Sequence, residues 1–309
     1  MVEQIVSATN SSVPKTSLGS YNSASNMKIS VVIITCERPD YLLSSLQSVF
    51  EQSHPPYEVI VVNDCSNADY SEVLAAYSDH NINYVLLPVR SGANVARNTG
   101  VELASGDVIA FLDDDDIWLN DFLASHHQEY LRAESIGAII CGHRIMESEN
   151  VVNINEQYEV TADELRHGNR FSGMSGFSAK TSVLREHAFD PQLKNGQDWD
   201  LFVRLIQHQI RFVNIQKALF LYREGTPGGI TAKVKKMKVE DVTPRLQSAI
   251  KHRDWLGEKF FKKRVAEQIL SFLPVKSNKL GWINKSIAHV GFTATVKTLA
   301  NQIRRKFIK

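Results

Sequence analysis

The stretch Val108-Ile-Ala-Phe-Leu-Asp-Asp-Asp-Asp-Ile-Trp118 joins five apolar residues directly to four carboxylates. Its first half has the length and composition of a β-strand that is buried on both faces. The carboxylates, residues 113–116, then stand at the carboxyl end of that strand, which is where open α/β sheets bind their ligands. The stretch therefore predicts an α/β fold with an acidic group at one edge of the sheet.

Two interpretations of the four carboxylates are open at this point. Neighbouring carboxylates repel each other, by about 1 kcal/mol for a pair ~4 Å apart in water and by several times more in a poorly solvated cleft. An exposed acidic turn would relieve the repulsion by pointing the side chains outward. A cleft would instead need a cation, and carboxylate oxygens suit hard ions such as Mg²⁺ or Mn²⁺, which also bind substrate phosphates. The buried strand ahead of the carboxylates favours the cleft.

The bulk composition is that of a soluble globular protein with an uneven distribution of charge. The 309 residues suffice for one large α/β domain with an appended region. The net charge of +1 hides an asymmetry, because residues 226–309 carry 19 Lys and Arg against 5 Asp and Glu, whereas residues 1–225 carry 16 against 29. A basic region on an acidic domain predicts an anionic partner for that region.

Cysteine usage and hydropathy predict a cytoplasmic address. Cys36, Cys65 and Cys141 show neither paired nor metal-binding spacing, which indicates reduced thiols in a reducing compartment. No apolar run approaches the ~20 residues of a membrane span, and the N-terminus lacks the apolar core of a secretory signal. Residues 1–26, rich in Ser, Asn and Thr, are expected to form a disordered leader.

Strands alternate with helices from residue 28 to residue 118. Apolar runs predict strands at 29–34, 57–62, 84–87 and 108–112, and helical spacing predicts helices that begin at Pro39-Asp40, at 71 and at 95. This alternation predicts a mostly parallel sheet covered by helices. Further strands are expected at 136–143 and 211–221, a loop-like segment with one short helix at 151–168, and helices at 233–309. Neither a G-x-G-x-x-G after the first strand nor a Walker motif is present, so a dinucleotide fold and a P-loop are not supported.

Three polar residues have both a functional and a structural explanation. Asp64 follows the second strand, where it can accept hydrogen bonds from a ribose or a base, or cap the next helix. Arg97 can pair with phosphates or with the acidic stretch, or can lie on a solvated helix face. Asp198 opens an expected helix after Gly196, either as a general base or as a residue that favours the helix dipole.

Three other segments have distinctive composition. The small residues of 172–177 suit a pocket wall, and the Gly/Pro-rich residues 222–229 suit a loop that closes over a site. From Ile283 to Phe307, apolar residues recur at helical spacing with Lys and Arg between them. That pattern fits a helix lying on an anionic membrane surface, and equally a helix packed on the domain or on a partner. It lacks the interleaved aromatic residues of a surface for single-stranded nucleic acid, so no nucleic-acid partner is expected.

Taken together in order, four motifs resemble those of inverting family 2 glycosyltransferases with a GT-A fold. They are Ser30-Val-Val-Ile-Ile-Thr-Cys-Glu-Arg-Pro39, Glu58-Val-Ile-Val-Val-Asn-Asp-Cys-Ser66, Ala96-Arg-Asn-Thr-Gly100 leading to Ala110-Phe-Leu-Asp-Asp-Asp-Asp-Ile-Trp118, and Gln197-Asp-Trp-Asp-Leu-Phe-Val-Arg-Leu205. The resemblance covers residues 28–225. It implies a Rossmann-like nucleotide-diphospho-sugar transferase domain at 27–225, with a mixed, mostly parallel sheet flanked by helices, and a basic helical region at 226–309.

The resemblance also implies a role for individual residues. Asp198 matches the catalytic base, although the family usually has Glu where this chain has Gln197. Asp113-Asp114-Asp115 match the D-x-D element, with Asp114 towards the ribose and Asp115, together with Asp113, holding Mg²⁺ or Mn²⁺ on the diphosphate. The remaining matched positions fall to the nucleotide-sugar pocket (Thr35, Glu37, Arg38, Asp64 and Arg97) and to the acceptor side or pocket wall (Ser175, Gly176 and Trp199).

The function implied by the resemblance is transfer of a sugar, with inversion, from a nucleotide-diphosphate donor to an acceptor hydroxyl. A UDP-sugar is the expected donor, and the acceptor a glycan or a lipid-linked glycan in surface polysaccharide or glycolipid synthesis. The basic helix would hold the enzyme peripherally at the inner face of the membrane. Two alternatives stay open. A nucleotide-sugar-binding module without turnover is disfavoured by the retained Asp198, and a nucleotidyltransferase would need a Gly-rich triphosphate loop, which Thr35-Cys-Glu-Arg38 is not.

Overall fold

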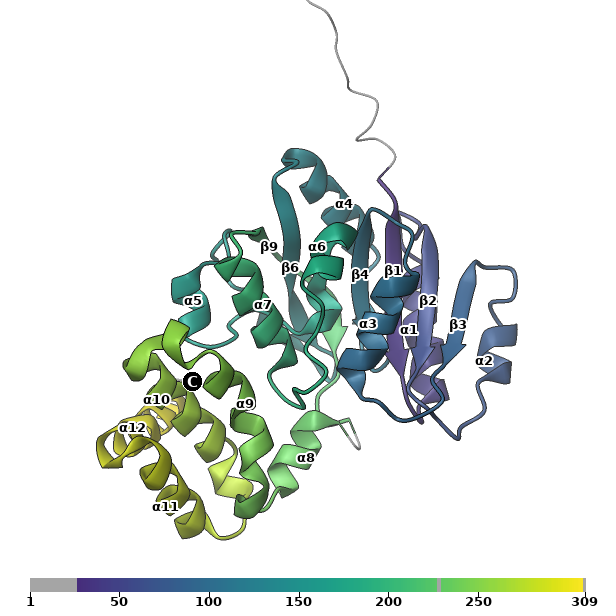
Figure 1. The fold of residues 1–309 in the computed structure, drawn as a ribbon. Helices are drawn as coiled ribbons and strands as arrows, with labels where there is room; N and C mark the ends of the chain where they lie inside the picture. Colours follow the sequence, from purple (N-terminus) through teal and green to yellow (C-terminus); the bar gives the residue numbers. More distant parts are fainter. Residues whose placement is uncertain (1–26, 227–228, 308–309) are drawn as a thin grey trace, which may run out of the picture.

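The computed structural model describes residues 27–226 and 229–307, so the leader expected at 1–26 lies outside the described residues. Within the described ranges nine strands form one mixed sheet in the order β3-β2-β1-β4-β8-β6-β9-β5, with β7 paired to β6 (Figure 1). The strands are β1 (Ile29–Thr35), β2 (Glu58–Asn63), β3 (Ile82–Leu86), β4 (Val108–Asp113), β5 (Ile117–Trp118), β6 (Ile136–Ile145), β7 (Ser148–Asn153), β8 (Phe177–Lys180) and β9 (Arg211–Tyr222).

Helices cover both faces of this sheet and then form a separate C-terminal group (Figure 1). They are α1 (Pro39–Phe50), α2 (Ser71–Ala75), α3 (Ala93–Leu103), α4 (Phe122–Arg132), α5 (Ala162–Arg166), α6 (Thr181–Glu186), α7 (Gln197–Gln207), α8 (Ile230–Lys236), α9 (Thr243–Lys251), α10 (Arg253–Leu270), α11 (Lys279–Val290) and α12 (Phe292–Phe307). A short 3₁₀ helix, η2 (Met174–Gly176), leads into β8.

The four strands nearest the β3 edge are parallel, which confirms the expectation from the strand–helix alternation. In their register Thr35 lies opposite Asn63, and Ile34 lies opposite Asp113. The residues that follow β1, β2 and β4 therefore meet at one edge of the sheet. The other half is mixed, because β8 runs antiparallel to both β4 and β6 while β6 and β9 are parallel.

The sheet separates two apolar cores. One face packs against α3 and α7 through residues such as Val32, Ile60 and Phe202. The opposite face packs against α1 and α4 through residues such as Ile33, Leu46 and Phe122. Because Val108–Leu112 is buried on both faces, as its unbroken apolar run predicts, β4 lies in the centre of the molecule.

Two local expectations are wrong. The loop expected from residue 151 begins instead with β7, which pairs with β6 through Val152 opposite Arg144. Its sequence, Ser148-Glu-Asn-Val-Val-Asn153, does not alternate between apolar and polar residues, so periodicity does not predict a strand there. The amphipathic stretch from Ile283 to Phe307 is not one helix, because Gly291 adopts a φ of 82° between α11 and α12. Such a left-handed conformation ends a helix at little cost only for glycine.

The C-terminal helices have their own core and also contact the sheet domain. Val242, Leu246 and Trp282 belong to that core. Leu256, on the first turn of α10, instead packs into the core shared with α7. None of the helices in the described part of the chain combines the length and apolarity that crossing a membrane would require.

Candidate active site

A cleft of about 810 Å³ opens where β1, β2 and β4 end. Pockets of this size hold drug-sized ligands and cofactors. Its walls come from the loops after β1, β2 and β4, from the segment before α3, from the start of α7 and from the segment between β9 and α8. They carry six basic residues beside the acidic ones: Arg38, Arg90, Arg97, Lys194, Arg223 and Lys233.

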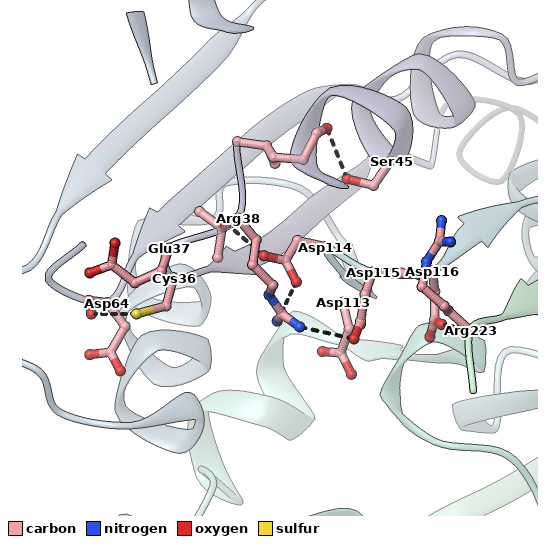
Figure 2. Close-up of polar contacts among 12 residues, drawn as sticks. Cys36, Glu37, Arg38, Ser45, Asp64, Asp113, Asp114, Asp115, Asp116 and Arg223 are labelled. Atoms are coloured by element: carbon pink, nitrogen blue, oxygen red, sulfur yellow. Dashed lines mark hydrogen bonds and ion pairs between the residues drawn. The ribbon is translucent and has the colours of Figure 1, made fainter. Parts of the chain in front are cut away.

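The four consecutive carboxylates at the end of β4 have two different environments (Figure 2). A tight turn, closed by the Asp116 amide donating to the Asp113 carbonyl at 3.1 Å, points alternate side chains in different directions. The side chains of Asp113 and Asp115 are 32% and 19% exposed. Asp114 and Asp116 are buried. Only Asp113 and Asp115 therefore offer accessible carboxylates to a ligand in the cleft.

Arg38 and Arg97 form ion pairs with this acidic turn. Arg38 places one guanidinium nitrogen 2.5 Å from Asp114 and another 3.0 Å from Asp115 (Figure 2). Arg97 lies 2.6 Å from Asp113. Burial nevertheless raises the pKa of Asp114 to about 7, against the opposing effects of Arg38 and of the Thr35 hydroxyl, which donates to Asp114 at 2.7 Å.

Asp116 anchors the turn to the rest of the fold. Its two carboxylate oxygens accept hydrogen bonds from the Ser175 hydroxyl at 2.5 Å and from the Arg223 amide at 3.0 Å. Burial raises the pKa of Asp116 well above its usual range. The Arg223 guanidinium also donates to the Asp115 carbonyl at 3.1 Å. The Asp116 side chain therefore ties the turn to η2 and to the end of β9.

Asp64, after β2, organises the loop that enters α3. Its two oxygens accept from the amides of Ser91 at 2.6 Å and Gly92 at 2.8 Å. It does not cap α2, whose N-cap position is Tyr70. Each carboxylate oxygen has a second lone pair, so Asp64 can still accept a hydrogen bond from a ligand in the cleft.

Thr35 and Glu37 organise the loop after β1. The buried Thr35 hydroxyl joins Asp114 to the Tyr70 hydroxyl, 3.0 Å away. Glu37 accepts from the Asn67 amide at 2.9 Å, and that hydrogen bond is the main reason its pKa lies below its usual range. Both residues, which the family resemblance assigns to a nucleotide-sugar pocket, line the cleft.

Asp198 lies at the start of α7 and is not among the residues that line the cleft. Its carboxylate accepts from the Asn169 side chain at 2.8 Å and from the Trp199 amide at 2.8 Å. The preceding Gln197 does line the cleft, and Arg97 donates to its side chain at 3.5 Å. Arg97 thus connects Asp113, at the end of β4, to the residue next to Asp198.

The three residues predicted for a pocket wall are buried behind the site. Ser175 donates to Asp116 and accepts from the Asp113 amide at 3.1 Å, so it holds both ends of the acidic turn in place. Gly176 is packed tightly against Phe220 and Ser172. Trp199 is 1% exposed and donates to the Leu165 carbonyl at 2.8 Å. None of the three is among the residues that line the cleft.

Several lining residues were not singled out from the sequence. Arg90 and Lys194 lie on loops whose place beside β4 depends on the fold. Arg223 lies in the Gly/Pro-rich segment 222–229, for which the composition predicts only a loop that closes over a site. Lys233, on α8, brings the basic C-terminal region to the edge of the cleft. The excess of Lys and Arg after residue 226 was a signal for that last contact, but only the fold shows where it is made.

The acidic turn has the chemistry of a site for a hard divalent ion. In the described ranges no three His, Cys, Asp or Glu side chains are grouped as metal ligands. Asp113 and Asp115 are two accessible carboxylates, and Mg²⁺ is commonly bound by one or two carboxylates together with substrate phosphates. The residues present therefore fit an ion that shares its coordination with a bound diphosphate.

Comparisons with known proteins place this chain among glycosyltransferases. The profile described as Glycosyl transferase family 2 matches residues 30–191, more than half of the chain. The putative teichuronic acid biosynthesis glycosyltransferase TuaG of Bacillus subtilis is 38% identical over 120 residues, which are 38% of this chain and 47% of that protein. The chain thus aligns with about half the length of this relative.

Two solved structures share the fold. Residues 1–349 of TarS from S. aureus, in complex with UDP-GlcNAc, align with a TM-score of 0.64 at 21% identity, over 84% of this chain and 79% of that one. The mannosyltransferase PcManGT from Pyrobaculum calidifontis, in complex with GDP-Man and Mn²⁺, aligns with a TM-score of 0.58 at 17% identity, over 90% and 80%. Because the family profile covers more than half of the chain, including β4 and the acidic turn that follows it, the chain belongs to glycosyl transferase family 2.

Proposed function

We propose that this family 2 chain transfers a sugar, with inversion, from a nucleotide-diphosphate donor to an acceptor hydroxyl of a surface polysaccharide or a lipid-linked glycan. The observation that carries the proposal is the contact of Arg97 with both Asp113 and Gln197. It brings the acidic end of β4 next to the start of α7, where Asp198 is the candidate base. A donor in the cleft therefore has an acidic turn on one side and a candidate base close to the other.

The cleft suits a nucleoside diphosphate. Its basic side chains match the negative charge of a diphosphate, and arginine guanidinium groups bind phosphate oxygens in a bidentate manner. Asp64, Glu37 and Thr35 supply acceptors near the ends of β1 and β2 for the hydroxyl and N–H groups of a nucleoside. A UDP-sugar is the proposed donor, in keeping with the UDP-GlcNAc bound by TarS, which shares the fold.

Asp115 and Asp113 are the residues that would hold Mg²⁺ or Mn²⁺. A bound divalent ion supplies Lewis-acid stabilisation of the negative charge that develops on a departing diphosphate. Arg38 already compensates part of the charge of the turn and contacts Asp115 from the wall of the cleft. PcManGT, which shares the fold, was solved with Mn²⁺, and its presence there supports the assignment.

Asp198 is the proposed general base. Asn169 and the Trp199 amide hold its carboxylate in one orientation. In this role it takes the proton of the acceptor hydroxyl while the oxygen attacks the anomeric carbon from the face opposite the diphosphate. The anomeric carbon–oxygen bond to the diphosphate breaks in the same step, which inverts the configuration.

The experiment is a measurement of nucleoside diphosphate release and of donor binding. Wild-type chain is incubated with a panel of UDP-sugars and Mn²⁺, with water as the acceptor, and diphosphate release is followed. We expect release with at least one donor, and a loss of at least ~10²-fold in Asp198→Asn, because a general base contributes about 10²–10⁴-fold. Thermal stabilisation by that donor should be the same in both. Stabilisation without release in the wild type would instead identify a binding module, and no stabilisation would exclude the donor assignment.

We also propose that the chain works peripherally at the inner face of an anionic membrane. The last 42 residues, 268–309, hold eight Lys and Arg and no Asp or Glu. Two polar residues of helix α12, Thr295 and Thr298, face inward and are 1% and 5% exposed. Its apolar residues Phe292, Val296 and Ile303 are instead 68%, 45% and 57% exposed. An exposed apolar stripe with basic neighbours matches the surface of an interfacial helix.

Vesicle sedimentation tests this proposal. We expect the full chain to sediment with phosphatidylglycerol vesicles and not with phosphatidylcholine vesicles. Replacing Phe292, Val296 and Ile303 together with Ser should weaken sedimentation at least ~10-fold. The control changes Leu86 and Val89, which are 55% and 63% exposed on the sheet domain, to Ser. Equal sedimentation of the α12 variant and the control contradicts the proposal, as does a change in oligomeric state without a change in vesicle binding.

A further inference from the structure

Arg264, on α10, lies over the indole ring of Trp199, the residue that follows the candidate base. Its guanidinium carbon is 3.4 Å from the centre of the Trp199 ring. His252 and Trp255 meet the same indole edge-on, with ring centres 5.4 and 6.3 Å away. Trp199 is therefore enclosed by residues from the C-terminal helical region, which lies outside residues 30–191 matched by the family profile.

The Arg264 guanidinium has few partners of its own. In the part of the chain that the structure describes, its side chain forms no ion pair, and its Nε is inaccessible and without a hydrogen-bond partner. The charges that favour its protonated form are those of Asp198 and Glu267. Burial lowers the pKa of Arg264 to about 10, and Asp198 acts in the opposite direction. A partly buried guanidinium whose Nε is cut off from solvent loses part of its hydration, and contact with an aromatic ring, worth about 2 kcal/mol when desolvated, offsets part of that cost.

The position of Arg264 is set by the backbone around Asp198. A Cβ atom at Gly168 would lie 3.7 Å from one guanidinium nitrogen, and a Cβ at Gly196 would lie 3.9 Å from the other. Gly196 has a φ of 67° and forms the N-cap of α7. Gly168 precedes Asn169, which holds the Asp198 carboxylate. The guanidinium thus lies beside both segments that orient the candidate base.

We propose that Arg264 is a positioning residue for Asp198, supplied to the active site by the C-terminal helices. Its positive charge attracts the Asp198 carboxylate through space, and its contact with the Trp199 ring holds the first turn of α7 in place. The inference rests on the proposed function, because it assigns to Asp198 the role of base. It adds that the region after residue 226 takes part in the transfer step.

The test compares Arg264→Met with Arg253→Met in the full-length chain. Arg253 is also on α10 and also lies over an aromatic ring, 4.7 Å from the centre of Phe261, but its side chain is 58% exposed. Release of UDP from a UDP-sugar is measured with Mn²⁺ and water as the acceptor. We expect Arg264→Met to lower kcat about 10–100-fold while the KM for the donor changes less than ~3-fold, and Arg253→Met to change neither.

A second measurement separates positioning from general structural damage. In an Asp198→Asn background, Arg264→Met should lower the residual rate less than ~2-fold, because a residue that acts through Asp198 has no further effect once that carboxylate is gone. Arg264→Lys keeps the charge without the planar stack, so it should retain an intermediate kcat, and it serves as the test if the Met variant does not fold. Equal losses in the wild-type and Asp198→Asn backgrounds, or a kcat equal to that of Arg253→Met, would overturn the inference. A wild type that releases no diphosphate would instead refute the proposed function.

Discussion

Asp198 and Asp200, two positions apart at the start of α7, face opposite sides of that helix and have different partners. Asp198 is held by the neutral Asn169 side chain. Asp200 is fully buried and accepts from His252 at 2.7 Å and from Arg204 at 3.0 Å, with Lys251 at 2.9 Å. Two of those three partners, His252 and Lys251, come from the C-terminal helical region. Of the two acids that open α7, one is therefore a candidate for chemistry and the other joins the two parts of the fold.

Replacing Asp200 should cost stability. Asp200→Asn leaves Arg204 and Lys251 without their buried counter-charge. We expect the free energy of unfolding to fall by about 2–3 kcal/mol, less than the 3–5 kcal/mol of a fully buried pair because both cations are partly exposed. Urea unfolding measures the change. The control is Asp190→Asn, which removes a more exposed partner of the same Lys251 and should cost less than about 1 kcal/mol. Equal losses would contradict the assignment.

The stability of the protein should depend on pH through Asp114. Its pKa is raised to about 7 in the folded state, against about 3.9 in an unfolded chain. The folded state therefore binds a proton more tightly, and Asp114 lowers the free energy of unfolding as pH rises from about 4 to 7, by at most about 4 kcal/mol. We expect Asp114→Asn to flatten this part of a urea-unfolding profile recorded with EDTA. An unchanged slope between pH about 4 and 7 would refute the prediction.

Gly173 and Gly176, on either side of Met174-Ser175, should differ in how much stability the protein loses when each is replaced by alanine. A Cβ at Gly176 would meet the buried Phe220 ring at 2.8 Å and the Cys141 carbonyl at 3.1 Å, whereas a Cβ at Gly173 would meet nothing within 4 Å. We expect Gly176→Ala to lower the free energy of unfolding by about 1–3 kcal/mol, the usual cost of overpacking, and Gly173→Ala to have a much smaller effect. Thermal unfolding checks both, and comparable shifts would show that the region around η2 adjusts freely.

Arg38 should control how strongly divalent ions stabilise the protein. Arg38→Met leaves Asp114 and Asp115 without their guanidinium partner. We expect a lower Tm in EDTA and a larger rise in Tm on adding MnCl₂ than in the wild type, because the ion then supplies the missing positive charge. Arg90→Met is the control, since Arg90 lines the same cleft and has no ion pair to the acidic turn among the described residues. A smaller Mn²⁺ response in Arg38→Met would contradict the prediction.

The sequence alone determined the parallel half of the sheet and the place of its ligand site. Local patterns are sufficient there, because an apolar run such as Val108–Leu112 has to be buried, and parallel strands bring their carboxyl ends to one edge. The residues that follow β1, β2 and β4 could therefore be assigned to one site before their contacts were known. The motifs that resemble family 2 added a prediction of which of those residues meet the donor.

Only the tertiary structure decided which partners each acidic side chain has and how deeply it is buried. Asp113, Asp114, Asp115 and Asp116 are identical in sequence terms, and the turn that separates them is completed by partners as distant as Arg223, 107 residues from Asp116. Asp198 and Asp200 differ because His252 and Lys251 reach only one of them. The charge, burial and hydrogen bonds of a side chain depend on groups that are brought together by folding, and no local pattern of residues specifies them.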